Sequence, residues 1–421
     1  MFPYHLQSSH TWESVRSGGG VDWHRQPAVF KYYPARFPAI ALKTVPGLHE
    51  LLLLSGGLSA EKKYPGGSYF LRVNPSAGAL YPCELYLQAR GVEGLEDGVY
   101  HFEPFRERLR LLHRLTDDQG LEAVMADRRR VMGLIFLVTA LYYRSSWKYG
   151  DRAYRYCLLD SGHMLGCIEA AATVQKRPFQ LVCRLERETL GRCFGFGRRE
   201  LVMAAAVSGR REEDLVAGLE MSLPFEDGTG FFTKNGVIEA AYAASARPVG
   251  CRPADGAEVY RFDADRLRRA ILARRSIRSF SGQPISREEF AEVSRVVRRP
   301  LATDCQVVVH PAMVVHRVEK MQPGIYDEHG CCRSGDFREF TGYLCLEQSL
   351  GSDGAVTVFW HSGAGNYLPT MLKAGILGQR IYLVSTALGF GCSGIGAFYD
   401  HDVAEFLETD EMILYAMAFG R

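Results

Sequence analysis

The sequence lacks several features that would assign it to a specialised class of protein. No apolar run approaches the length of a membrane span, and the first residues carry no basic segment followed by an apolar stretch, as a signal peptide would. The formal net charge is only +2, so neither nucleic acid nor an acidic membrane surface is an expected partner. These absences predict a cytoplasmic protein.

Metal and dinucleotide signals are also absent. The eleven cysteines form no CxxC motif and no paired Cys/His spacing, so we expect no metal site. Such cysteine usage favours reduced thiols in a cytosolic compartment. No strand–helix alternation carries a glycine fingerprint, which argues against a dinucleotide-binding domain of the Rossmann type.

The chain does have room for two domains. Its 421 residues are 47% hydrophobic and 23% charged, ordinary values for a globular protein, and either half could bury a sizeable core. Apolar spacing predicts helices over residues 154–174, 263–273, 287–297 and 367–388, and strands over residues 84–87, 134–140 and 203–207. Ser286 and Glu289 form the pattern of a capping box at one helix start. The mixture predicts an α+β fold.

The two halves of the chain resemble each other. Ser208-Gly209-Arg210 and the terminal Phe419-Gly420-Arg421 are 211 positions apart, and Gly98-Val99-Tyr100 and Gly324-Ile325-Tyr326 are 226 apart. Four further pairs share an offset of 213: Trp147 with Trp360, Gly150 with Gly363, Tyr154 with Tyr367, and Gly162 with Gly375. Matches in one order indicate an old duplication. We expect a first domain at residues 1–212, a connector at 213–258 and a second domain at 259–421.

One stretch in the second half is rich in arginine. Arg274, Arg275, Ser276 and Arg278 put three guanidinium groups and a hydroxyl within five residues. Guanidinium pairs with phosphate through two parallel hydrogen bonds, which lysine cannot make. A phosphomonoester carries close to two negative charges at neutral pH, so about two cations match it. The stretch predicts a phosphate grip, although a solvated basic helix end has the same residue types.

A second stretch, Asn74 to Pro82, packs small residues between two prolines. Ser76, Ala77 and Gly78 would let a backbone approach a flat ring closely, and its N–H groups could then donate to ring oxygens and nitrogens. A plain turn into the following strand is the alternative interpretation.

The residues from Pro75 to Tyr86 resemble the flavin-contacting loop of the nitroreductase superfamily, in the form typical of SagB-type dehydrogenases. Arg274 to Phe280 is similar to that superfamily's phosphate-gripping motif, and Gly394 to Phe398 to its late glycine loop. The Gly420-Arg421 terminus resembles its closing strand, and Trp147 to His163 is similar to SagB-type sequences. The resemblance covers most of both halves.

This resemblance implies two fused nitroreductase-like domains, each a mostly antiparallel sheet flanked by helices, that form an intramolecular pseudo-dimer with FMN at the interface. The residues it implies for the phosphate are Arg274, Arg275, Ser276, Arg278 and Arg421. Those it implies for the ring are Pro75, Ser76, Ala77, Gly78, Leu80, Gly394, Ile395 and Gly396.

Each half departs from the family pattern where the other half keeps it. The first-half counterpart of the arginine motif falls near Pro34 to Pro38, which has a single arginine. The second-half counterpart of the ring loop falls near Pro300 to Asp304, where Asp304 would place a carboxylate in the position of a small neutral residue. These losses predict one composite flavin site per chain and a second site that no longer functions.

Lys148-Tyr149 resembles the catalytic pair of SagB-type azoline dehydrogenases, and at the offset of 213 its second-half counterpart is His361-Ser362. Oxidation of an azoline to an azole removes a proton from one carbon and sends a hydride to flavin N5. A desolvated lysine or a phenolate can serve as the base. Residue types alone favour a surface lysine beside a buried aromatic residue, and it is the resemblance that favours the catalytic pair.

The resemblance thus implies an FMN-dependent oxidoreductase that oxidises azoline-type rings to azoles in a peptide or related natural product, with oxygen as the expected reoxidant. Two alternatives stay open. An NAD(P)H-dependent reductase of nitro or quinone substrates would use the same flavin site without Lys148-Tyr149. A catalytically degenerate partner protein of a biosynthetic complex would bind no flavin. The expected partners are a peptide or heterocyclic substrate and other biosynthetic enzymes, and the expected assembly is a monomeric pseudo-dimer or a homodimer.

Overall fold

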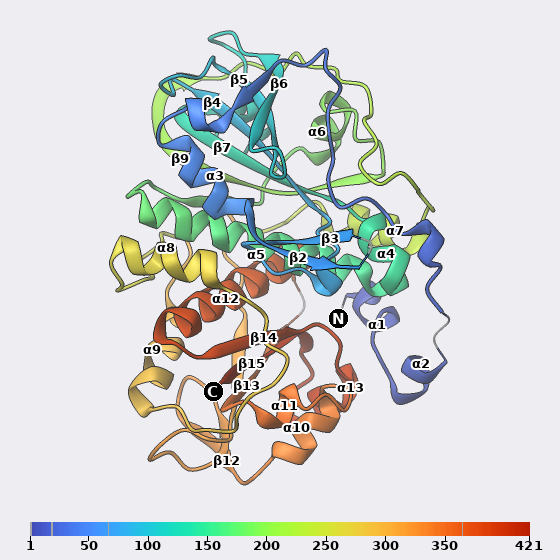
Figure 1. The fold of residues 1–421 in the computed structure, drawn as a ribbon, viewed down its shortest axis with the longest axis vertical. Helices are drawn as coiled ribbons and strands as arrows, with labels where there is room; N and C mark the ends of the chain where they lie inside the picture. Colours follow the sequence, from blue (N-terminus) through green and yellow to red (C-terminus); the bar gives the residue numbers. More distant parts are fainter. Residues whose placement is uncertain (1, 18–19, 66, 364) are drawn as a thin grey trace.

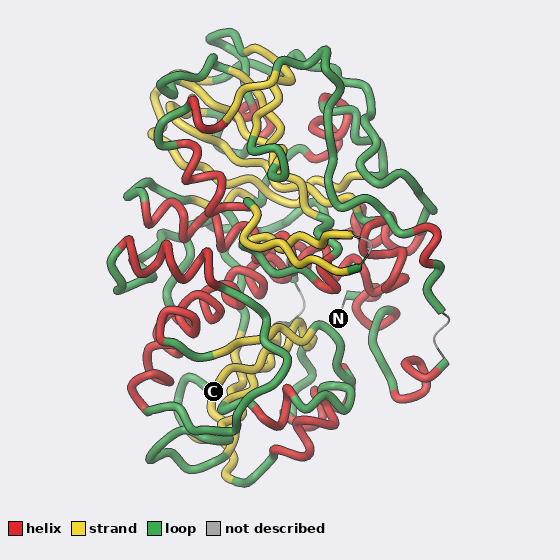
Figure 2. The backbone as a smooth tube through the Cα atoms, viewed as in Figure 1, coloured by secondary structure: helices red, strands yellow, loops and turns green. Residues whose placement is uncertain are grey.

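Two antiparallel sheets lie on either side of a central pair of long helices in the computed structural model, which describes residues 2–17, 20–65, 67–363 and 365–421 (Figure 1). The strand order is β1-β6-β5-β4-β7-β9-β8 in the first half and β12-β11-β10-β13-β15-β14 in the second. A separate two-stranded sheet pairs β2 with β3. Figure 2 shows the same layers, with helices between the two sets of strands. The predicted α+β fold with two sheet-bearing halves is confirmed.

The strands of the first half are β1 (Ala39–Ala41), β2 (Leu58–Tyr64), β3 (Gly67–Arg72), β4 (Cys83–Arg90), β5 (Gly98–Glu103), β6 (Arg108–Arg114), β7 (Arg129–Leu141), β8 (Gln180–Val182) and β9 (Glu200–Leu215). Those of the second half are β10 (His310–Val315), β11 (Gly324–Tyr326), β12 (Cys331–Ser334), β13 (Val356–Ser362), β14 (Gly391–Ile395) and β15 (Met412–Gly420). The helices are α1 (Pro3–Gln7), α2 (Trp12–Arg16), α3 (Leu48–Gly56), α4 (Tyr143–Tyr149), α5 (Ala153–Val174), α6 (Arg187–Cys193), α7 (Gly236–Ser245), α8 (Ala264–Ala273), α9 (Arg287–Arg298), α10 (Arg338–Leu344), α11 (Leu350–Asp353), α12 (Tyr367–Leu388) and α13 (Asp400–Phe406).

The helices α5, α8, α9 and α12 form where the apolar spacing predicts them. Ser286 caps α9 as expected, because its hydroxyl accepts from the Glu289 backbone N–H at 3.1 Å and the Glu289 carboxylate accepts from the Ser286 N–H at 2.7 Å. Helix α12 begins at Tyr367 in spite of Pro369. That proline lies in the first turn, where a backbone N–H has no intrahelical partner to lose.

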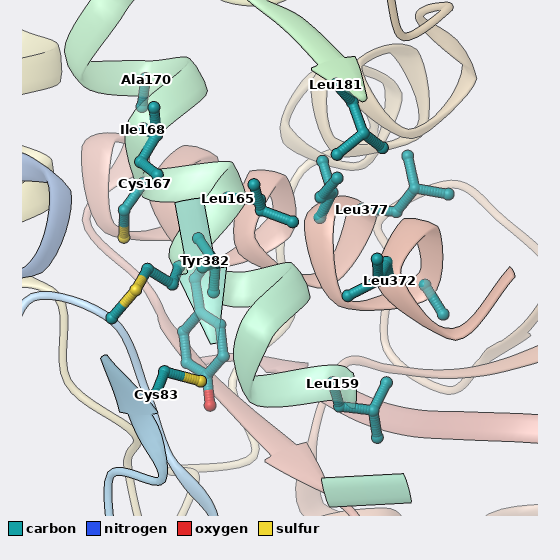
Figure 3. Close-up of a cluster of buried hydrophobic side chains, with 14 of the residues drawn as sticks. Cys83, Leu159, Leu165, Cys167, Ile168, Ala170, Leu181, Leu372, Leu377 and Tyr382 are labelled. Atoms are coloured by element: carbon teal, nitrogen blue, oxygen red, sulfur yellow. The ribbon is translucent and has the colours of Figure 1, made fainter. Parts of the chain in front are cut away.

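Helices α5 and α12 pack directly against each other and join the two halves. A methyl group on Gly162 would lie 2.8 Å from the Gly375 Cα, and one on Gly375 would lie 2.9 Å from the Gly162 Cα. These two glycines form one of the pairs at offset 213, so the duplicated helices cross at equivalent residues. Leu159 and Leu165 of α5 and Leu372 and Leu377 of α12 are buried (Figure 3). The halves therefore share one core.

The tyrosine pair Tyr100 and Tyr326 supports the duplication independently. Each follows a glycine in an equivalent strand, β5 or β11, and each hydroxyl donates to the carbonyl four residues earlier. The Tyr100 hydroxyl lies 2.6 Å from the Glu96 oxygen, and the Tyr326 hydroxyl lies 2.7 Å from the Gln322 oxygen. The two halves thus keep the same local geometry.

One of the sequence matches is wrong. Trp147 lies in α4, whereas Trp360 lies in β13, whose neighbours in the second sheet correspond to those of β7 in the first. The first half has eleven residues between β7 and α5, which include α4, whereas β13 ends at Ser362 and α12 begins at Tyr367. Lys148-Tyr149 therefore lies on an insertion in the first half, and His361-Ser362 is not its counterpart.

The predicted connector at residues 213–258 contains regular structure, namely the end of β9 and helix α7. Strand β9 continues to Leu215, past the predicted boundary at 212. Helix α7 packs on the first half, where Ser245 and Tyr154 hydroxyls lie 2.7 Å apart. Helix α1 makes the matching contact in the second half, with His5 Nδ1 at 3.2 Å from the Tyr367 hydroxyl. Each long helix thus has in its first turn a tyrosine that contacts a shorter helix from elsewhere in the chain.

Cys251 and Cys305 form a disulfide between residues 54 positions apart. The expectation of reduced thiols is wrong for this pair, because spacing rules do not detect cysteines that only the fold brings together. Among the described residues, none of the helices is both long enough and apolar enough to cross a membrane.

Candidate functional site

The predicted ring loop, Asn74 to Pro82, connects β3 to β4 in a strained conformation. Gly78, Ala79 and Tyr81 have φ angles of 59°, 51° and 45°. Left-handed conformations of this kind suit glycine but cost energy for alanine and tyrosine. Such strain persists only where surrounding contacts impose it, and it is common at functional sites.

Two buried arginines impose the loop conformation. Arg144 of α4 donates to the Tyr81 carbonyl at 2.9 Å and to the Glu84 carboxylate at 2.6 Å. Arg274 reaches across from the second half and donates from Nε to the Val73 carbonyl at 2.6 Å. Both halves of the chain therefore fix the path of the loop.

Asp160 of α5 anchors the ring loop through hydrogen bonds. Its carboxylate accepts from the Ser76 hydroxyl at 2.5 Å and from the Ala77 N–H at 3.3 Å, and the Ser76 oxygen in turn accepts from the Tyr81 N–H at 2.9 Å. Burial raises the pKa of Asp160 to about 7. The sequence interpretation missed this residue. The signal was an acidic side chain within a long, otherwise largely apolar helix.

The structure brings the ring loop and the Lys148-Tyr149 pair together. A methyl group on Gly78 would lie 2.5 Å from the Tyr149 hydroxyl and 3.5 Å from Lys148 Nζ. The Tyr149 ring packs edge-on against Tyr156, with centroids 4.7 Å apart, and burial raises the pKa of Tyr149. Lys148 is exposed, with its Nζ 5.4 Å from the centre of the Tyr149 ring.

The predicted glycine loop, Gly394 to Gly396, begins as the end of strand β14, since Gly394 and Ile395 pair with β15, and it lies beside the same residues. A methyl group on Gly396 would lie 2.4 Å from the ring of Tyr156. The Gly394 N–H donates to the Tyr382 hydroxyl at 2.6 Å, and that hydroxyl lies 2.7 Å from the hydroxyl of Ser276. Ile395 is buried in the hydrophobic cluster of the second half, so only its backbone is available to the site.

The other predicted ring contacts belong to the loop itself. Pro75, Ser76 and Ala77 are half-buried, Gly78 is exposed and Leu80 is buried. The polar surface that the loop can offer a ligand is therefore its backbone and the Ser76 hydroxyl.

The arginines predicted to bind phosphate differ in their environment: Arg274 is buried, whereas Arg275 and Arg278 are more accessible. Arg274 is only 3% exposed, and its donations to the carbonyls of Val73 and Arg72 give it a structural role as well. Arg275 is half-buried and bonds only to backbone carbonyls, including Ser59 at 2.8 Å. Arg278 is exposed. Neither Arg275 nor Arg278 has a carboxylate partner in the described part of the chain.

Arg421 lies close to this segment through its backbone but not through its side chain. The Arg421 carbonyl accepts from the Ser281 N–H at 2.7 Å, which places the end of the chain just beyond Arg278. Its guanidinium pairs with Glu289 of α9 at 3.0 Å and is 37% exposed. A half-exposed ion pair of this kind contributes little, so a phosphate could displace Glu289.

A segment of the second half covers the edge strand β8 of the first half. Strand β8 occupies the sheet position in the first half that β14 has in the second. Residues 302–304 run along β8, with the Leu181 N–H donating to Ala302 at 2.9 Å. The Asp304 carboxylate accepts from the N–H groups of Cys183 and Arg184 at 2.7 and 3.0 Å. The backbone N–H groups of Cys183 and Arg184, just after β8, are therefore already bonded within the chain.

One part of the complementary-loss interpretation is wrong. The segment Pro34 to Pro38 leads into β1, which lies at the opposite edge of the sheet from β8. It is therefore not the counterpart of the arginine segment, which lies beside β14 through a bridge between Ser276 and Cys392.

A cavity of about 1190 Å³ lies elsewhere, between α6, the start of β9 and α7. Its charged lining residues include Arg198, Lys234 and Glu239, and none of the predicted site residues borders it. Volume alone is a weak guide here, since the residues with flavin-site chemistry converge at the ring loop.

The residues of the ring loop and of the arginine segment fit FMN in charge and in their close-approaching backbone. Arg275 and Arg278 supply two positive charges without acidic partners among the described residues, which matches a phosphomonoester. Gly78 and Gly396 bring backbone close to aromatic rings at points where a side chain would clash. This combination suits a flat, phosphorylated ligand.

Gly78→Ala is expected to destabilise the protein by about 1–2 kcal/mol and to disturb the site. The new methyl group would meet the Tyr149 hydroxyl, and alanine disfavours a φ of 59°. Thermal unfolding of the purified variant measures the effect. Gly191→Ala in α6, where nothing lies within 4 Å, is the matched control. Equal stability losses in both variants would show that the ring loop does not need glycine.

Comparisons with known proteins agree with this geometry. Residues 271–421 match the nitroreductase family. A putative nitroreductase from Anabaena variabilis has 26% sequence identity and a TM-score of 0.80, over 99% of this chain and 98% of that one. A putative nitroreductase from Methanocaldococcus jannaschii is 31% identical over 134 residues, which is 31% of this chain.

The chain spans 63% of the length of the Methanocaldococcus relative. An Escherichia coli microcin synthetase complex aligns with 48% of this chain and 74% of its own, at 18% identity and a TM-score of 0.33, too low to support any inference. Residues 271–421 therefore form a nitroreductase family domain, and the chain as a whole has the nitroreductase-like fold in two sheet-bearing halves.

Proposed function

We propose that the protein is an FMN-dependent oxidoreductase with one composite flavin site per chain. The observation that carries the proposal is the convergence of Gly78, Lys148 and Tyr149 from the first half on the arginine segment of the second. The arginine segment reaches the first half through Arg274, which donates to the Val73 carbonyl at 2.6 Å, and through Arg275, which donates to the Ser59 carbonyl at 2.8 Å. Neither half contains all of these residues.

Within this class we propose oxidation of an azoline-type ring to an azole, in a peptide or related natural product, as in SagB-type dehydrogenases. Lys148 is the base that takes the carbon-bound proton. Its exposed amine lies beside the ring loop, where a methyl group on Gly78 would be 3.5 Å from Lys148 Nζ, so it is accessible to a substrate above the flavin. Bound FMN supplies a hydride acceptor. Tyr149 stays protonated because burial raises its pKa, so it orients substrate by donating a hydrogen bond.

Flavin stoichiometry tests the composite site. Purified protein saturated with FMN and desalted is expected to retain one FMN per chain, because residues 302–304 cover β8, the first-half counterpart of β14. The flavin absorbance divided by the protein concentration gives the ratio. Two FMN per chain would refute the loss of the second site. A colourless protein would refute the flavin site and favour the non-enzymatic partner role.

A reductase of nitro or quinone substrates is the second candidate, because the Anabaena and Methanocaldococcus proteins are both described as putative nitroreductases. Anaerobic mixing with NADH or NADPH separates the two activities. Rapid bleaching of the bound flavin would favour the reductase and count against the dehydrogenase. Slow bleaching, with turnover of an azoline peptide in the presence of oxygen, would favour the dehydrogenase.

A further inference from the structure

Asp160 is a buried acid without a compensating cation. Its side chain is 4% exposed, and no lysine, arginine or histidine lies within ion-pair distance of it in the described ranges. Both carboxylate oxygens face the ring loop, one toward the Ser76 hydroxyl and the other toward the Ala77 N–H. Burying an ionised carboxylate without a cation lowers the stability of the folded protein. Asp160 is therefore an unfavourable residue for stability alone.

The groups around Asp160 do not change charge near neutral pH. Burial raises the pKa of each neighbouring acid on the packed elements, namely Tyr149 of α4, Tyr81 and Cys83 of the loop and β4, Cys157 of α5, and Tyr415 of β15. His163, one turn along α5, points away toward Gln379 and Tyr415, and burial lowers its pKa to about 3. Asp160, with a pKa of about 7, is the exception.

The hydrogen-bond pattern shows what a change in this charge would do. The Ser76 oxygen accepts from the Tyr81 N–H, so its own hydrogen is free to point toward the carboxylate. Protonated Asp160 would instead donate to the Ser76 oxygen, which has a second lone pair. The Ser76 hydrogen would then turn toward the other side of the loop, and Ala77 would lose a charged acceptor.

We propose that Asp160 is a positioning residue whose charge sets the direction of the Ser76 hydroxyl and the Ala77 N–H, and with them the polarity that the ring loop presents to the flavin. The inference rests on the proposed function, in which this loop lines the flavin ring. Ionised Asp160 is expected to lower the flavin reduction potential, because it places a negative charge beside the site where electrons are taken up.

The first test needs no flavin. A group whose folded pKa is raised makes its stabilising contribution below its unfolded pKa and loses it as pH rises through the folded value. Asp160→Asn removes that loss, so its Tm is expected to exceed that of the parent protein at pH 8 and to approach it at pH 4. Asp117→Asn, an exposed acid, is the matched control. Equal pH profiles for parent and Asp160→Asn would overturn the proposal.

The second test measures the reduction potential of bound FMN between pH 5 and 9. The parent protein is expected to show a change in slope near pH 7 that Asp160→Asn lacks, and the variant potential should be the higher one at pH 8. Ser76→Ala should show a smaller change than the parent protein, since it removes the hydroxyl that Asp160 orients but leaves the charge of Asp160 in place. A parent-like slope in either variant would overturn the proposal. Loss of flavin from the parent protein itself would refute the proposed function and is visible before any variant is compared.

Discussion

Lys148→Arg is expected to reduce kcat for azoline oxidation by a factor of about 10²–10⁴ while one FMN per chain is retained. Arginine keeps the positive charge and length of the side chain but does not give up its proton at neutral pH, so it cannot accept one from carbon. Lys148 is exposed and is not among the residues that fix the ring loop, so the flavin site should stay intact. Steady-state turnover and flavin absorbance on the same preparation measure both quantities.

Lys43→Arg is the matched control for this substitution, because Lys43 is an exposed lysine in the same half and lies outside the site. Tyr149→Phe is expected to have a smaller effect than Lys148→Arg, since it removes a hydrogen-bond donor and leaves the base in place. Full activity in Lys148→Arg would exclude Lys148 as the base. Loss of FMN from Lys148→Arg would show that the residue acts in binding.

Much of the scaffold could be predicted from the sequence because local patterns determine it. The spacing of apolar residues located α5 and α12 nearly to the residue, and Gly162 and Gly375 turned out to be the contact point of the two helices. Glycines at the same position in two duplicated helices indicate that the helices pack closely at that position. The insertion of α4 was missed, because a tryptophan within it lies by coincidence at the offset that relates the two long helices.

The site was predicted less completely, because several roles depend on partners distant in sequence. The arginine motif suggested three equivalent phosphate ligands, yet Arg274 is buried against the carbonyls of residues 72 and 73. The sequence alone could not show that residues 302–304 pair with β8 or that Asp304 bonds to the backbone just after it. Asp160 could not be distinguished from an ordinary helical acid until its two loop contacts were visible.

The double substitution Arg275→Ala/Arg278→Ala is expected to weaken FMN binding by a factor of about 10²–10⁴. Hydrogen bonds to a charged group are stronger than neutral ones, and each lost guanidinium should cost about tenfold to a hundredfold in affinity. Fluorescence titration of the apo-protein with FMN gives Kd for each variant. Riboflavin, which lacks the phosphate, should bind the parent protein and the double variant about equally.

The riboflavin comparison separates phosphate recognition from a general loss of structure. Arg269→Ala, an exposed arginine on α8, controls for the loss of one surface charge and should leave the Kd for FMN unchanged. Arg421→Ala shows whether the terminal guanidinium leaves Glu289 for the phosphate, because only then does FMN affinity fall. If Arg275→Ala/Arg278→Ala bound FMN as tightly as the parent protein, the phosphate would lie elsewhere. The contribution of the second half to the flavin site would then be limited to the ring contacts predicted for Gly394 to Gly396.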